Sequence, residues 1–143
     1  MANAAIKKAR PKYLSLAALL FEIRLPLPGW VSILHRVSGA LIFLLLPLVI
    51  WLFDTSVSSE ISYARFTSAF VAGIGFVPGW FVKLVSLALI WAYCHHFIAG
   101  VRHLWMDATH SVSKEQGRSS AIVTLVLGVL LTVLLGAKLF GLY

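Results

Sequence analysis

Charged residues are scarce in this chain. Asp, Glu, Lys and Arg make up 12% of its 143 residues, whereas soluble domains carry about 25%. Hydrophobic residues account for 60%, and the mean hydropathy is +0.93. This composition excludes an ordinary water-soluble domain and predicts a protein that is solvated by lipid. The net charge of +7 does not indicate nucleic-acid binding, because the basic residues lie at the ends of apolar runs.

Acidic residues and cysteine are scarcer still. The five acidic residues all lie outside the long apolar runs. A small proton or ion carrier would pair its basic groups with an acid inside the bilayer, so that alternative is disfavoured. The single cysteine, Cys94, excludes an intrachain disulfide framework. Because Cys94 lies within an apolar run, we expect it to be a small packing side chain.

Three apolar runs are long enough to cross a membrane, since about 20 helical residues span the hydrocarbon layer. The predicted spans are Val31 to Phe53, Trp80 to Met106 and Ser120 to Phe140. Residues 61–79 are interrupted by glycine and proline, and we expect an interfacial connector there. Small residues at four-residue spacing in the third span predict a close packing face, either for a partner helix or for the first two spans: Thr124, Gly128, Thr132 and Gly136.

Lysine and arginine are unevenly distributed about these spans. Because cytoplasmic loops are enriched in basic residues, the distribution predicts a cytoplasmic N-terminus. Residues 1–30 lack a small-residue cleavage site after their short apolar stretch, so we expect a retained surface segment rather than a signal peptide. Nine basic residues lie on the N-terminal side and three on the other: Lys7, Lys8, Arg10, Lys12, Arg24, Arg36, Arg102, Lys114 and Arg118 against Arg65, Lys83 and Lys138.

Polar side chains stand inside two of the spans, where a charged group costs about 2.5–3.5 kcal/mol at the bilayer centre. The first two spans are antiparallel, so both polar groups fall in the cytoplasmic half, and we expect one shared site. The first group begins span one and the second occupies the latter half of span two: Ser32, His35 and Arg36, then His95, His96, Arg102 and His103.

His96 and His103 are expected on one helical face, since seven residues at about 100° each leave them about 20° apart. The small side chains of Ala92, Ala99 and Gly100 lie near that face and predict clearance for a flat macrocycle. An imidazole nitrogen is a suitable axial ligand for haem iron, which makes His96 a candidate ligand. The residues alone also allow a buried, hydrogen-bonded histidine or a proton relay at this position.

Three basic residues could serve the propionates of such a haem through charge-assisted hydrogen bonds: His35, Arg36 and His103. His95 lies about 100° from His96 around the helix, and we expect it to bond to a neighbouring helix instead. Ser32 and Arg36 are four residues apart and so share a face, where they could hydrogen-bond a quinone carbonyl. Equally, Ser32 could cap the helix while Arg36 extends to lipid phosphates.

Two motifs resemble those of the cytochrome b subunit of succinate dehydrogenase. Ser32 to Gly39 follows the family's pattern S-x-x-H-R-x-[ST]-G, and His96 to Asp107 follows H-x-x-x-G-x-R-H-x-x-x-D. Arg10-Pro11 also fits the family's N-terminal pattern. The resemblance covers nearly the whole chain, and the spacing to Gly100 selects His96 from the doublet His95-His96.

The resemblance implies an all-α membrane protein that packs with a partner subunit into a haem-binding bundle. By similarity, His96 is the axial ligand on this chain for a b-type haem shared with a second small membrane subunit. Ser32 and Arg36 match positions that contact ubiquinone, and His35, Arg36 and His103 match positions near the propionates.

The partners implied are that second anchor subunit, an iron–sulfur subunit and a flavoprotein that oxidises succinate. A bacterial inner membrane is the expected location, since no presequence is recognised. The alternative functions are a haem-free anchor of a fumarate reductase-like complex, a self-contained cytochrome b and the small carrier. The self-contained cytochrome is disfavoured because it would need two axial ligands at one depth from different spans.

Overall fold

The computed structural model describes residues 25–111 and 113–143, and that part of the chain is almost entirely helical. The predicted surface segment, as far as residue 24, lies outside the described residues. Three of the helices, α1, α4 and α5, are long and apolar enough to cross a membrane, which confirms the all-α, three-span prediction. The helices are α1 (Leu27–Leu44), α2 (Leu46–Val57), α3 (Glu60–Val71), α4 (Gly79–Thr109) and α5 (Lys114–Leu139).

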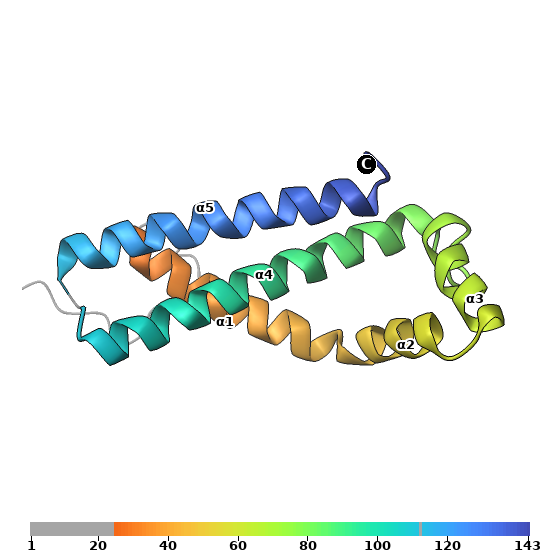
Figure 1. Cartoon of the computed structure of the whole chain (residues 1–143), viewed down its shortest axis with the longest axis horizontal. Coiled ribbons are helices and arrows are strands. Elements are labelled where there is room, and N and C mark those ends of the chain that lie inside the picture. The colour runs from red at the N-terminus through yellow and green to blue at the C-terminus, as the bar shows by residue number, and fades with distance from the viewer. Residues whose placement is uncertain (1–24, 112) are drawn as a thin grey trace, which may run out of the picture.

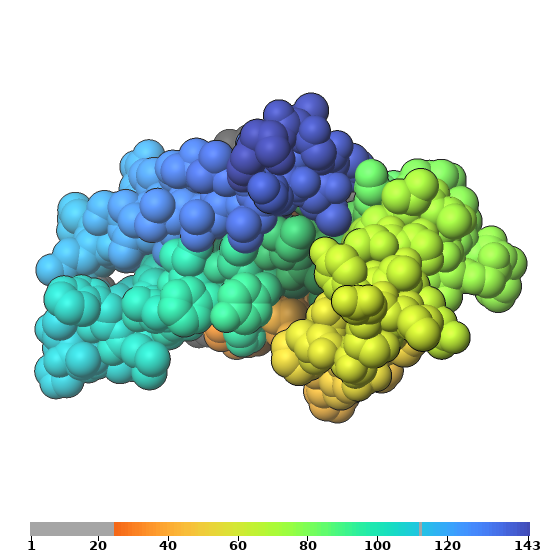
Figure 2. Space-filling model, turned by 45° about the vertical axis from the view of Figure 1, so that its right-hand side comes forward, coloured from red at the N-terminus to blue at the C-terminus, as the bar shows by residue number. Residues whose placement is uncertain are grey.

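Helix α4 is the central element of the bundle. It packs against α5 on one side and against α1 on the other, and α1 also contacts α5 (Figure 1). Helices α2 and α3 pack on each other at the end of the molecule where α4 begins (Figure 2). The start of α1, the end of α4 and the start of α5 therefore meet at the opposite end.

The first predicted span is divided at Leu45. The helix begins at Leu27, earlier than expected, and stops at Leu44 before resuming as α2. Pro47 has no N–H to donate to the carbonyl of Phe43, and its ring crowds that carbonyl, which breaks the helix at this point. The predicted interfacial connector after α2 is partly helical, because α3 occupies its first part.

Serine side chains fix where α3 and α5 begin. Ser59 accepts a hydrogen bond from the backbone N–H of Ser62, whose hydroxyl accepts one from the Ser59 N–H in return. Ser113 and Gln116 form the same reciprocal pair at the start of α5, at 3.2 Å in both directions. Each pair satisfies two of the N–H groups that a helix start leaves without partners. At the end of α4, His110 turns the chain in the left-handed conformation.

The interior of the bundle holds small and polar side chains, while most large apolar side chains are exposed. Val31, Ala99 and Ala121 meet where α1, α4 and α5 pack together, and Cys94 is buried as expected. The chain exposes its large apolar side chains along all three long helices. This arrangement suits a lipid solvent, in which small residues let helices approach while large ones face acyl chains or other subunits.

The small residues of α5 face the chain's own α4. A Cβ atom at Gly128 would lie 3.6 Å from Nδ1 of His95, and one at Gly136 would lie 2.7 Å from Cδ1 of Leu87. Thr124 is buried on the same stripe, and Thr132 is half-buried. Of the two occupants that the sequence allowed for this face, the structure therefore selects the chain's own helices over a partner helix.

Candidate functional site

Three of the predicted site histidines come together where α1 crosses α4. The ring of His35, on α1, stacks on that of His96 with centroids 4.1 Å apart and planes 13° apart. The same ring lies 5.3 Å from the ring of His103. His35 therefore contacts both α4 histidines, and the two polar groups of the first and second spans lie at one depth in the bundle.

The hydrogen bonds of His96 determine which of its ring nitrogens is free. Its Nδ1 lies 3.0 Å from the backbone carbonyl oxygen of His35. A carbonyl oxygen only accepts hydrogen bonds, so Nδ1 carries the proton and donates, and Nε2 keeps its lone pair. The Ser38 hydroxyl donates to the same carbonyl at 2.9 Å and lies 3.3 Å from Nδ1. An imidazole oriented in this way presents Nε2 as a metal ligand.

Ser38 and Gly39 complete this arrangement, and the sequence analysis gave neither of them a role. Ser38 is fully buried beside the His35 carbonyl. A Cβ atom at Gly39 would lie 2.8 Å from Cε1 of His96, so only glycine leaves room for the ring. The signal was present in the motif, because Ser38 and Gly39 follow His35 by three and four residues and so share its face of α1.

Ser32 and Arg36 lie on a different part of the α1 surface. Arg36 is exposed and Ser32 is half-buried. Arg36 follows His35 directly, which turns it about 100° around the helix from the histidine cluster. The two side chains lie one helical turn apart near the start of α1 and remain open to a molecule or subunit outside this chain.

His95 is buried on the side of α4 that faces α5. Its ring is 2% exposed and packs against Gly128 and the ring of Trp91. Its Nε2 has no hydrogen-bond partner among the described residues. The predicted hydrogen bond of His95 to a neighbouring helix was not assigned to either ring nitrogen, and it stays a prediction. The enclosed position also leaves no open face of the ring for a large planar group.

The expected clearance beside His96 is only partly present. Ala92 and Ala99 are fully buried, and Ala99 packs against Val31 and Ala121 in the core. Their role is to let α4 approach its neighbours, so the prediction that they leave an open face is wrong. Gly100 is half-exposed, and a Cβ atom there would lie 3.6 Å from Nε2 of His35.

The described residues form no site in which side chains alone could bind a metal ion. No group of three or more His, Cys, Asp or Glu side chains in residues 25–111 and 113–143 could hold a metal ion. Haem differs in this respect, because its porphyrin supplies four ligands and the protein adds only one or two. His96 fits haem iron for two reasons. Its Nε2 is free because Nδ1 makes the hydrogen bond to His35, and its ring is only half-buried.

Comparison with known proteins gives the family. The model of the succinate dehydrogenase/fumarate reductase transmembrane subunit matches residues 8–135, which include every candidate site residue. The chain belongs to this family. It is thus a membrane subunit of an oxidoreductase complex.

Curated relatives agree with the family assignment. The chain is similar to the succinate dehydrogenase cytochrome b556 subunit of Coxiella burnetii, with 32% identity over 82% of this chain and 89% of the relative. It is also similar to the subunit of the same name from Paracoccus denitrificans, with 30% identity over 78% and 80%. The corresponding Rickettsia prowazekii subunit is 26% identical over 73% of this chain and 75% of the relative. The resemblance inferred from the two motifs is therefore confirmed.

Proposed function

We propose that this chain is the cytochrome b anchor of a bacterial succinate:quinone oxidoreductase, with His96 as its axial ligand to a b-type haem. The observation that carries the proposal is the hydrogen bond from His96 Nδ1 to the His35 carbonyl, which leaves Nε2 available. The names of the relatives support a cytochrome. Bound haem would supply one-electron transfer between the iron–sulfur subunit and the quinone site.

The histidine cluster supports both the binding and the orientation of haem. The ring of His96 is half-buried, whereas His95 is enclosed by the bundle, so of these two adjacent histidines it is His96 that has an open side. His35 and His103 lie beside it as hydrogen-bond donors for the propionates, and Arg36 extends from the next position of α1. An imidazole of the second anchor subunit would complete the protein ligands of the iron, and haem would then be part of the contact between the two subunits.

The same chain contributes to the ubiquinone site. The Ser32 hydroxyl and the Arg36 guanidinium donate hydrogen bonds to a quinone carbonyl oxygen and stabilise the negative charge that develops there during reduction. Both are placed for this because they are one turn apart on α1 and open to the outside of the chain. With a cytoplasmic N-terminus, this edge faces the iron–sulfur and flavoprotein subunits, and protons reach the quinone from the cytoplasm.

The visible spectrum of the purified complex tests the haem assignment. We expect the dithionite-reduced complex to show the α-band of a low-spin b-type cytochrome and to yield porphyrin on extraction with acid acetone. Both follow from two imidazole ligands to the iron. A colourless complex that still reduces quinone would contradict the haem assignment and support the haem-free anchor of a fumarate reductase-like enzyme.

Gly39→Ala tests the orientation of the His96 ring. The added methyl group would lie 2.8 Å from Cε1 and 3.2 Å from Nδ1 of His96, so the ring must shift and its hydrogen bond to the His35 carbonyl must lengthen. Disturbing a group that orients a metal ligand costs about 10- to 100-fold in affinity, and we expect a lower haem-to-protein ratio. Gly29→Ala is the matched control on the same helix, because its methyl group would meet Leu25 at an ordinary 3.5 Å. Equal haem content in the two variants would contradict the prediction.

A further inference from the structure

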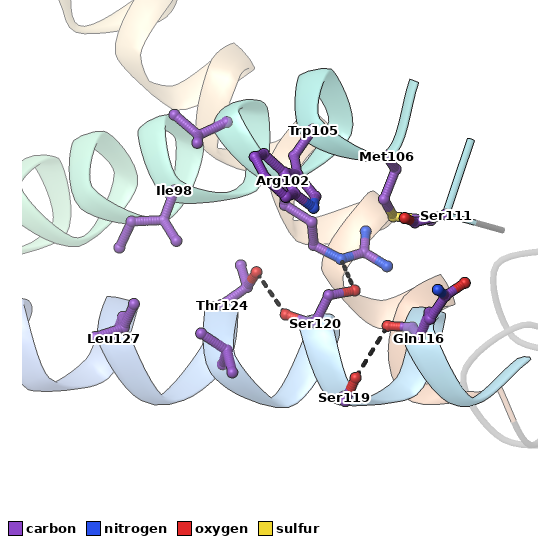
Figure 3. Close-up of a pocket in the computed structure, with 12 residues that line it drawn as sticks. Ile98, Arg102, Trp105, Met106, Ser111, Gln116, Ser119, Ser120, Thr124 and Leu127 are labelled. Carbon is purple, nitrogen blue, oxygen red and sulfur yellow. Dashed lines mark hydrogen bonds between the residues drawn. The ribbon is translucent and has the colours of Figure 1, made fainter. Parts of the chain in front are cut away.

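Arg102 is a buried cation, and its two hydrogen-bond acceptors among the described residues are both neutral. Its side chain is 7% exposed and extends from α4 toward α5 (Figure 3). Nε donates to the Ser120 hydroxyl at 3.0 Å, and Nη2 donates to the Gly117 carbonyl at 3.2 Å. A guanidinium has five N–H groups, so three remain for another acceptor. A buried charge without a counter-ion is costly, which points to an anion from outside the described residues.

Two cavities meet at this guanidinium. The first cavity, of about 510 Å³, lies between α4 and α5, and its lining is polar at one end and apolar at the other. Near Arg102 it is lined by Ser120, and farther along α4 and α5 by Ile98 and Leu127 (Figure 3); Ser119 and Val123 also line it. A cavity with one polar, cationic end and one apolar end matches a molecule with an anionic head and a hydrocarbon chain.

The second cavity, of about 640 Å³, adds positive charge on the other side of Arg102. Lys114 and Arg118, from the first turns of α5, line it together with residues that precede or begin α1. Among residues 25–111 and 113–143, no acidic residue lines either cavity. Three cations around one buried point, with no carboxylate among the lining residues that the structure describes, favour a ligand that carries negative charge.

We propose that this place binds an anionic phospholipid of the surrounding bilayer. The lipid phosphate accepts hydrogen bonds from the free N–H groups of Arg102 and is attracted by Lys114 and Arg118. One acyl chain lies in the cavity between α4 and α5. The lipid supplies the missing counter-ion and fills the groove, so it holds the end of α4 to the start of α5. This site is on the side of α4 away from the contact between His35 and His96.

Lipid binding to the assembled complex tests the proposal. The complex would be stripped of lipid in mild detergent and titrated with dioleoylphosphatidylglycerol or dioleoylphosphatidylcholine, with bound lipid counted by native mass spectrometry. We expect a saturable phosphatidylglycerol site that phosphatidylcholine fills poorly. Arg102→Gln should weaken phosphatidylglycerol binding by about tenfold or more, as expected for loss of a charge-assisted hydrogen bond. Arg118→Gln should weaken it by about fivefold.

A second pair of variants tests the acyl-chain cavity without touching Arg102, and so remains informative if Arg102→Gln fails to assemble. Val123→Trp fills the cavity and should abolish the saturable site. Val126→Trp is the matched control, since Val126 is equally exposed on α5 but does not line the cavity. Unchanged phosphatidylglycerol binding in Val123→Trp would overturn the proposal.

Two further outcomes would also overturn it. Binding of inorganic phosphate that competes with the lipid, together with no effect of Val123→Trp, would mean a simple anion site. The absence of any preference for phosphatidylglycerol in the unmodified complex would mean that a carboxylate of another subunit neutralises Arg102.

Discussion

The variant His96→Ala is expected to assemble with its partners but to retain about a tenth or less of the haem of the unmodified complex. Loss of an axial ligand is more severe than loss of a group that orients the ligand, which already costs about 10- to 100-fold in affinity. The removed ring is half-buried rather than part of the Val31, Ala99 and Ala121 core, so helix packing should persist. The measurement is the reduced-minus-oxidised spectrum per mole of complex, with assembly checked by gel filtration.

The neighbouring histidines provide the comparison for His96→Ala. His110→Ala removes an exposed histidine at the end of α4 and should leave the spectrum unchanged. His95→Ala removes a buried ring and should lower the thermal stability of the complex while its haem stays bound. A full spectrum in His96→Ala combined with a lost spectrum in His95→Ala would transfer the ligand role to His95. A full spectrum in both variants would remove the haem ligand from this chain.

The second large effect is expected at the quinone site. Arg36→Ala should slow succinate-dependent reduction of a ubiquinone analogue by about tenfold to 100-fold, because it removes a charged donor from the oxygen where charge develops. Ser32→Ala removes a neutral donor and should slow it by about tenfold or less. Reduction of an artificial dye by the soluble subunits should stay unchanged in both variants, since the dye does not use the membrane site.

Arg65→Ala is the matched control for Arg36→Ala. Arg65 is an exposed arginine on α3, at the other end of the bundle from Ser32 and Arg36. It should leave both activities unchanged. Equal loss of quinone and dye reduction in Arg36→Ala would indicate misassembly and would contradict a specific role in the quinone site. Haem content measured on the same samples separates the quinone role of Arg36 from its expected contact with a propionate.

The proposed lipid site and the proposed haem site are independent of each other. Arg102 and His103 are adjacent in the sequence, yet Arg102 extends to α5 while His103 lies beside His35 of α1. Successive positions of a helix point about 100° apart, so one motif can supply groups to two sides of the same helix. Weaker phosphatidylglycerol binding with an intact haem spectrum is therefore the expected signature of Arg118→Gln.

Some features of the fold could be predicted from residue order alone. The length and composition of the apolar runs fix three spans, because a helix must satisfy its own backbone hydrogen bonds in lipid. The break at Leu45 was also readable in principle, since Pro47 lacks the N–H that a continuous helix requires. Residue spacing placed His96 and His103 near one face of α4, and the structure brings both beside His35.

Other features depended on how the helices pack. Small side chains at Ala92 and Ala99 are compatible with an open face or with close helix contact, and only the packing of α4 against its neighbours buried them. The same holds for the α5 stripe, which faces its own α4. Spacing cannot decide such cases, because a helical face is defined by its neighbours as well as by its own residues.

The sequence by itself determined the number of spans, the two motifs and the depth at which the polar groups stand, because these depend on hydropathy and helical periodicity along one chain. Only the tertiary structure decided that the His35 carbonyl meets Nδ1 of His96, that His95 is enclosed and that no acidic residue of the described part of the chain lines the cavities beside Arg102. The physical reason is that a hydrogen bond, an open ring face and an uncompensated charge each depend on atoms brought together from different helices.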